Sequence, residues 1–157
     1  MTAPPTGTRE VLVFEVGGQT YGLPIADVRE LVRAVTITPL PNAPAVIEGV
    51  VNVRGRVLPV MDVRSRFRLS PKPLDPSDHF IVASAGPRGV ILRVDRATHL
   101  AVVDEGAVQA PETLGTGAVY VAGVARLEDG LVLIHDLATF LSEAEAVSLD
   151  EALLATA

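Results

Sequence analysis

Residues 49–63 read Gly-Val-Val-Asn-Val-Arg-Gly-Arg-Val-Leu-Pro-Val-Met-Asp-Val, and this stretch decides the fold. Two apolar runs flank the pair Arg54-Gly55, which predicts a β-hairpin with that pair at its tip. Asp62 follows the second run directly, so its carboxylate is expected to cap a short helix that begins at Val63.

The same pattern returns about 74 residues later. Residues 123–137 read Gly-Val-Ala-Arg-Leu-Glu-Asp-Gly-Leu-Val-Leu-Ile-His-Asp-Leu, again two apolar runs, a glycine turn and an aspartate. This repetition predicts two related small β units. Because each unit alone would bury little apolar surface, the two are expected to share an interface, with a groove between them.

Composition supports an all-β protein. The 157 residues include 30 Val and Ile but only six aromatic rings, together with 13 Gly and 12 Pro. There is no cysteine, which excludes disulfides and thiolate metal sites. No apolar run has the length of a membrane span and the first residues form no apolar signal core, so a soluble cytoplasmic protein is expected.

The order of elements follows from periodicity and turn residues. Residues 1–8 are expected to be a disordered leader, and Ile25, Val28, Leu31 and Val32 recur at helical spacing. Three prolines in 70–78 mark an internal boundary, and the net charge is +2 through Asp75 and −8 from Pro76 on. The remaining predictions are strands at 11–16, 21–25, 80–85, 90–94, 101–103, 119–124 and 131–135, an extended segment at 36–41, at most one helical turn at 45–49, a loop through 115–117, and two short helices after residue 142.

Catalytic patterns are scarce. His79 and His99 lack a second ligand at metal-binding spacing, and only His135-Asp136 pairs a histidine with a carboxylate. A metal-dependent hydrolase that uses this pair with Asp62 and Asp95 is a remote alternative. No serine lies in a nucleophile-elbow motif, and no glycine-rich phosphate loop is present.

Five arginines fall between residues 54 and 68, but the net charge of −6 argues against nucleic-acid binding. Arg64, Arg66 and Arg68 are best interpreted as a solvated helix face. Arg54 is different, because turn chemistry explains its neighbours Asn52 and Gly55 but requires no arginine. With Glu30, on the predicted helix beside Val28, Arg54 fits a protein-docking patch better than a catalytic site. On the residues alone, solvated surface charges are the favoured interpretation of each.

The motif G-x-x-N-x-R-G-x-x-x-P-x-x-D, from Gly49 to Asp62, combines with Tyr21-Gly22-Leu23-Pro24-Ile25 and Val28-Arg29-Glu30 upstream. In order and spacing these pieces resemble the chemotaxis coupling protein family CheW. The resemblance runs from about residue 10 to residue 141 and is looser in the second half, where Ile91 stands at a position usually held by glycine.

This resemblance implies an all-β fold with short helices, built as two intertwined five-stranded SH3-like barrels within one domain (9–141), with a seam near 70–78 and a helical tail (142–157). It implies a non-enzymatic adaptor without cofactor or metal, recruited to membrane-associated arrays. Its expected partners are the cytoplasmic tip of chemoreceptors and the regulatory domain of the kinase CheA, with weak self-association in arrays and neither nucleic-acid binding nor membrane insertion.

The same resemblance assigns residues to surfaces. Arg54, Glu30, Val28 and Leu100 are expected at the receptor-binding surface, and Gly49, Gly123, Asn52 and Gly55 at kinase-binding or structural positions. A coupling protein of a non-flagellar pathway, with pilus motility, development or a second messenger as output, is the alternative within this fold. Neighbouring genes distinguish the two.

Overall fold

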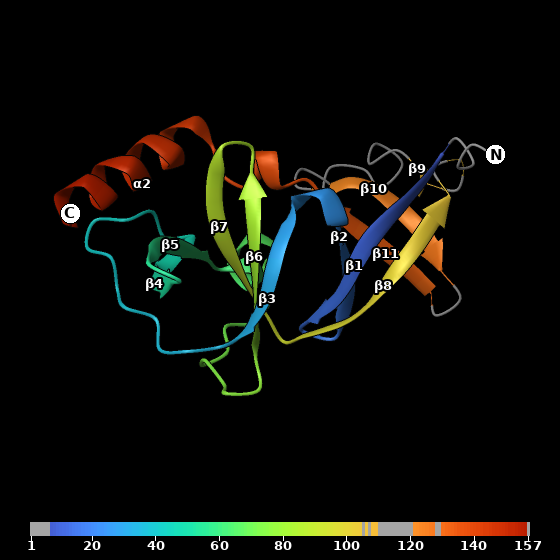
Figure 1. Ribbon diagram of the computed structural model, residues 1–157, viewed down its shortest axis with the longest axis horizontal. Coiled ribbons are helices and arrows are strands. Elements are labelled where there is room, and N and C mark those ends of the chain that lie inside the picture. The colour runs from blue at the N-terminus through green and yellow to red at the C-terminus, as the bar shows by residue number, and fades with distance from the viewer. Residues whose placement is uncertain (1–6, 105, 107, 110–120, 128–129, 157) are drawn as a thin grey trace.

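The computed structural model describes residues 7–104, 106, 108–109, 121–127 and 130–156, and these form two β-sheets side by side (Figure 1). The six-stranded sheet has the order β8-β1-β2-β11-β10-β9. Its strands are β1 (Thr8–Val16), β2 (Gln19–Pro24), β8 (Arg96–Asp104), β9 (Val108–Gln109), β10 (Val121–Leu127) and β11 (Gly130–His135).

The five-stranded sheet has the order β3-β6-β7-β5-β4. Its strands are β3 (Val28–Arg33), β4 (Ile47–Val53), β5 (Arg56–Met61), β6 (His79–Ala85) and β7 (Arg88–Val94). The predicted hairpin at Arg54-Gly55 is therefore confirmed as β4 and β5. Two five-stranded units were expected, but β9 adds a sixth strand to one of the two sheets. At the place in the five-stranded sheet that corresponds to β9, only an isolated bridge between Thr38 and Val50 forms.

The internal repeat is confirmed in three dimensions. After β5, Asp62 accepts from the Ser65 amide at the start of α1 (Val63–Arg66); after β11, Asp136 accepts from the Ala138 amide at the start of the 3₁₀ turn η4 (Leu137–Thr139). In each sheet one strand pair is parallel: β5 with β7, and β11 with β2. The two repeats thus have the same sequence of elements.

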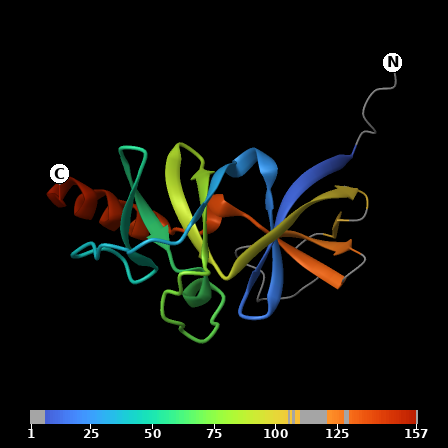
Figure 2. The ribbon, with the colours of Figure 1, turned by 60° about the horizontal axis from the view of Figure 1, so that its bottom comes forward.

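The two repeats exchange their first hairpins. The β1–β2 hairpin joins the sheet that contains β8 to β11, and the β6–β7 hairpin joins the sheet that contains β3 to β5. The chain therefore passes between the sheets twice, after β2 and after β7 (Figure 2). Segment 70–78 separates the repeats along the chain, but it connects α1 to β6 within the five-stranded sheet. The sequence suggested a seam near 70–78, but the boundary between the two sheets lies elsewhere, at the two connections after β2 and after β7.

Three clusters of buried side chains make up the core. The largest lies between the sheets, and residues such as Phe14 and Tyr21 from one sheet meet Ile81 and Leu92 from the other. Each sheet also encloses a smaller cluster of its own, around Val13 in one and its counterpart Val82 in the other. The strands of both hairpins bury both faces, which explains their nearly continuous apolar sequences.

Residues 25–32 do not form the predicted helix. A single 3₁₀ turn, η1 (Ile25–Asp27), leads directly into β3, where half-buried and exposed residues alternate. Pairing of β3 with β6 outweighs the helical spacing, because three of the four apolar residues at this spacing are β-branched and pack well on a sheet. Residues 45–49 likewise enter β4 at Ile47, so the helical turn expected there is absent.

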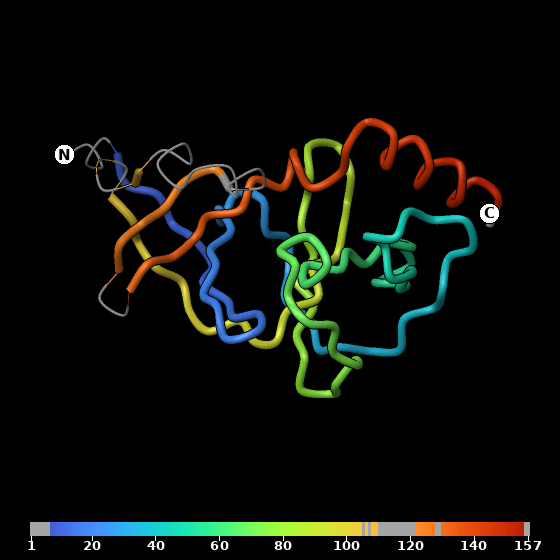
Figure 3. The backbone as a smooth tube through the Cα atoms, turned by 180° about the vertical axis from the view of Figure 1, so that it is seen from behind, coloured from blue at the N-terminus to red at the C-terminus, as the bar shows by residue number. Residues whose placement is uncertain are grey.

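The chain ends in one helix, α2 (Glu143–Thr156), where two short helices were predicted. Ser142 and Glu145 form a capping box, each side chain accepting from the other residue's amide. Leu149 and Ala152 enter the shared core, so α2 covers the five-stranded sheet at the end away from β8 to β11 (Figure 3). Of the leader predicted at 1–8, residues 1–6 lie outside the described residues, whereas Thr8 already begins β1. The loop predicted at 115–117 and the start of the strand at 119–120 also lie outside the described residues.

The arginines after Asp62 are not a solvated face. Arg64 pairs with Asp95, and Arg66 pairs with Glu145 on α2; both arginine side chains are 14% exposed. Only Arg68 is exposed, at a left-handed position (φ 56°) that ends α1. The prediction of a solvated face was wrong because the local charge and spacing carry no information about ion-pair partners that lie 31 and 79 residues away in the sequence.

Candidate docking surface

The tip of the β4–β5 hairpin is a two-residue turn. Arg54 (φ 51°) and Gly55 (φ 85°) both adopt left-handed backbone, the combination that a type I′ turn needs. The Asn52 side chain accepts from the Gly55 amide at 2.9 Å and stabilises the turn. A left-handed arginine costs roughly 1–2 kcal/mol relative to glycine, so the turn alone does not account for Arg54.

The Arg54 side chain contacts Glu30. Arg54 Nε donates to the two carboxylate oxygens of Glu30 at 3.2 and 3.1 Å. The Arg54 side chain is 79% exposed, whereas that of Glu30 is 28% exposed. Glu30 lies on β3 rather than on the predicted helix, but the two residues that the sequence singled out are neighbours.

This ion pair borders a groove of about 520 Å³. Two hairpin tips and the edge strand β3 form its walls. Arg29 and Arg56 also line it, and Arg29 Nε donates at 2.8 Å to the hydroxyl of Ser84 on the neighbouring strand β6. Three arginines against one glutamate give the groove a positive charge that suits an acidic protein surface. Its remaining lining residues are Val53, Leu58, Val82, Gly86, Pro87 and Gly89.

The other two residues of the expected receptor surface lie apart from this groove. Val28 is on β3 but packs against the shared core. Leu100 is 55% exposed and lies on β8, the edge strand of the other sheet. Its counterpart on β3 is Leu31, 46% exposed. The four residues therefore divide between two sheets.

Gly49 and Gly123 occupy equivalent positions at equivalent bulges. A Cβ on Gly49 would overlap the Thr38 carbonyl oxygen, and a Cβ on Gly123 would lie 2.5 Å from Val108 Cγ1. In each case a neighbouring segment crosses over the glycine and pairs with the next residue, as Thr38 does with Val50. Local packing thus explains both glycines.

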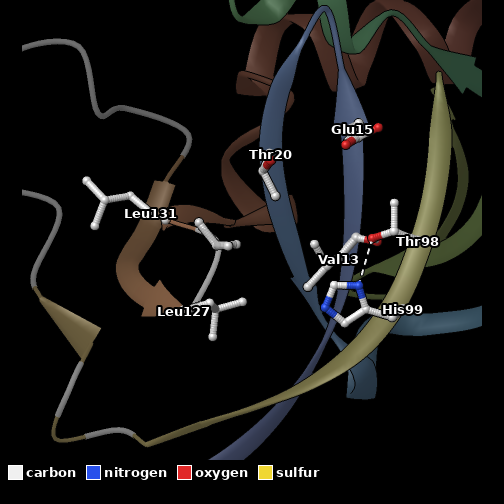
Figure 4. Close-up of a pocket in the computed structure, with 9 residues that line it drawn as sticks. Val13, Glu15, Thr20, Thr98, His99, Leu127 and Leu131 are labelled. Atoms are coloured by element: carbon white, nitrogen blue, oxygen red, sulfur yellow. Dashed lines mark hydrogen bonds between the residues drawn. The ribbon is translucent and has the colours of Figure 1, made fainter.

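A second hollow, of about 220 Å³, lies at the corresponding place in the six-stranded sheet (Figure 4). By strand register, Thr98 and His99 on β8 are the equivalents of Arg29 and Glu30 on β3. Leu127 is likewise the equivalent of Val53. Its lining contains no arginine. The charged groove is therefore a feature of the first repeat's tip rather than of the fold.

His135 belongs to the core. Phe14, Tyr21, Phe67 and Phe140 surround its ring at centroid distances of 4.6–5.2 Å, and neither ring nitrogen has a hydrogen-bond partner among the described residues. Burial lowers its pKa from 6.5 to about 3. Among the described residues, no three histidines or carboxylates gather in a way that could hold a metal ion. The metal-dependent hydrolase is thus unsupported: His135 packs in an aromatic cluster and Asp136 caps η4.

Comparison with known proteins agrees with this geometry. Residues 10–145 match the family model described as CheW-like domain. The chain is 31% identical over 144 residues to the chemotaxis protein CheW of Klebsiella aerogenes, a match that covers 90% of this chain and 87% of that protein. It is 28% identical over 142 residues to the chemotaxis protein CheW of Treponema pallidum, a match that covers 87% of this chain and 84% of that protein. The crystal structure of the scaffolding protein TtCheW from Thermoanaerobacter tengcongensis matches with a TM-score of 0.80 at 29% identity, covering 87% and 94%.

Two β-sheets with exchanged hairpins around a shared core define a small all-β module. The chain belongs to the CheW-like family, and it is a scaffolding protein of chemotaxis signalling rather than an enzyme. In the part of the chain that the structure describes, no helix is both long and apolar enough to cross a membrane.

Proposed function

We propose that this protein couples chemoreceptors to the histidine kinase CheA, at arrays on the cytoplasmic face of the membrane, and that the Arg54–Glu30 groove receives the receptor's cytoplasmic tip. The observation that carries this proposal is the exposed arginine held at a strained tip by a carboxylate on another strand. An arginine fixed in this way keeps most of its donors directed toward solvent, where they can pair with an acidic partner surface.

The exposed aliphatic side chain of Leu31, next to Glu30 on the edge strand β3, supports a neighbouring apolar contact. Docking interfaces commonly combine an apolar centre with charged residues at the rim. Binding to the kinase regulatory domain at the same time would raise the local concentration of kinase at the receptor through avidity.

The test is a binding assay with a receptor-tip fragment and the kinase regulatory domain, each alone and then together. Arg54→Asp is expected to abolish receptor binding, because it places a carboxylate beside Glu30 at the docking surface. The melting temperature should change by only a few degrees, since exposed ion pairs contribute about 0–1 kcal/mol.

A matched control is available on the other sheet. Arg96 is 64% exposed and pairs with Glu15 at 3.0 Å, so Arg96→Asp removes a similar ion pair far from the groove. This control is expected to bind receptor normally. Receptor binding by Arg54→Asp at the parental affinity would show that the groove does not receive the receptor.

A further inference from the structure

The turn between β6 and β7 forms one wall of the Arg54–Glu30 groove. Gly86 (φ 64°) and Pro87 make this two-residue turn, and both line the groove together with Gly89. Gly89, just after the turn, lies against the side chain of Arg56: a Cβ added at Gly89 would be 3.0 Å from Arg56 Nη2. A small displacement of the turn therefore changes the width of the groove and the position of Arg56.

A third hollow, separate from the one in the six-stranded sheet, lies on the other side of this turn. Pro87 and Arg88 also line a mostly apolar, half-open hollow of about 210 Å³ between the turn and the start of α2, together with Met61, Leu137, Leu141 and Ala146 among others. Core packing reaches the base of the turn through Ala85, whereas Gly86 and Pro87 at its tip border a hollow on each side. Because packed side chains resist displacement better than a tip bordered by hollows, a further contact near the tip would help to fix its position.

The structure provides one such contact. Arg88 Nη1, on the residue after Pro87, donates to Asp150 Oδ1 on α2 at 2.7 Å. The helix itself is anchored by Leu149 and Ala152 in the shared core and by Glu145, which pairs with Arg66. Asp150 thus joins the groove wall to a well-anchored element.

We infer that Asp150 is a positioning residue of the docking groove: through Arg88 it holds the Gly86–Pro87 turn at the separation from Arg54 and Glu30 that the partner requires. The inference rests on the proposed function of the groove. It assigns α2, the tail of the domain, a part in binding beyond covering the core.

Two readouts test it. In ¹H–¹⁵N spectra, Asp150→Asn is expected to shift the amide signals of Gly86 and Gly89. The Kd for a receptor-tip fragment should rise about two- to fivefold, the range that an exposed ion pair can contribute. Glu151→Gln makes the same change on the next, exposed residue of α2 and should alter neither. The exchanged pair Arg88→Asp with Asp150→Arg should restore the Kd.

The outcomes separate the inference from the function it rests on. Unshifted Gly86 and Gly89 signals, or equal shifts in Glu151→Gln, would overturn the positioning role. Shifted signals with an unchanged Kd would also overturn it, provided that Arg54→Asp weakens binding. If Arg54→Asp has no effect on binding, the proposed docking site fails, and the glycine signals still decide whether Asp150 positions the turn.

Discussion

Arg64 Nη2 lies 2.8 and 2.7 Å from the two carboxylate oxygens of Asp95, and the Gly17 amide donates to the same carboxylate at 2.9 Å. This cluster joins α1 and the connection between β7 and β8 to the turn between β1 and β2. It therefore fastens the two sheets to each other where the chain passes between them. Burial raises the pKa of Asp95, but the hydrogen bonds from Arg64 and Gly17 outweigh burial, and the net effect lowers it.

Loss of this ion pair should destabilise the fold. Arg64→Ala is expected to lower the free energy of unfolding by about 2 kcal/mol, because hydrogen bonds to charged, half-buried groups contribute about 1.5–3 kcal/mol. Arg68→Ala, four residues away and exposed, should change it by less than about 0.5 kcal/mol. Urea titrations of both variants provide the measurement, and equal effects would contradict the structural role of Arg64.

Stability should fall in mild acid because of His135. The pKa of His135 in the folded protein is about 3, below the ordinary value of 6.5. Between these two pH values the imidazole is therefore protonated in the unfolded chain but neutral in the folded protein. Stability is therefore highest above pH 6.5 and should decrease by up to about 1.4 kcal/mol per pH unit as the pH falls toward 3. Calorimetry between pH 7 and 4 measures this slope.

His135→Met introduces the residue found at the equivalent position of the first repeat, Met61, and should flatten that slope. It also removes two buried nitrogens that lack partners, so stability at pH 7 should be maintained or increased. His99→Met, at an exposed position, serves as the control and should retain the parental slope. A steep slope in His135→Met would refute the assignment.

Gly49 should tolerate no side chain. Gly49→Ala is expected to cost about 3 kcal/mol or more, because the added methyl overlaps the Thr38 carbonyl group, which pairs with Val50. Gly55→Ala has open space and should cost only about 1 kcal/mol for its left-handed backbone. Thermal unfolding of both variants gives the difference.

A rescue separates steric overlap from other effects. At Gly123 the nearest obstacle is the side chain of Val108, so Gly123→Ala should regain stability when combined with Val108→Ala. Simple addition of the two single effects would contradict the proposed overlap.

The capping box of α2 gives a test of the single terminal helix. Ser142→Ala should cost about 1 kcal/mol, because the Glu145 amide loses its acceptor. Ser148→Ala, which lies within α2 and is exposed, should be neutral or slightly stabilising. Circular dichroism during thermal unfolding follows both; a comparable loss for Ser148→Ala would favour two helices.

Much of the fold could be predicted from local patterns. The hairpin around Arg54-Gly55, the repeat and both aspartate caps depend on turn and capping chemistry within a few residues, and all are confirmed. The strand β3 was predicted as a helix because its pairing with β6 lies some 50 residues away and outweighs a short helical pattern. Similarly, nothing near Arg64 in the sequence indicates Asp95.

The candidate surface shows the same division. Arg54 and Glu30 could be selected by reasoning from the turn and from family resemblance, and the structure brings their side chains into contact. Gly86, Pro87 and Arg56 were not selected, because a groove wall formed by two hairpin tips requires knowledge of which hairpins share a sheet. A repeat in the sequence identifies the elements, but it does not show that they exchange.

The exchanged hairpins interlock the two halves of the chain, one before and one after segment 70–78. Each half supplies strands to both sheets, so neither half can leave without removing two strands from a sheet that the other half mainly forms. A peptide bond cut within 70–78 should leave the halves interlocked as a stable pair. For a scaffold this means that a nick in this connection would not release either sheet, so the surfaces on both sheets would stay joined.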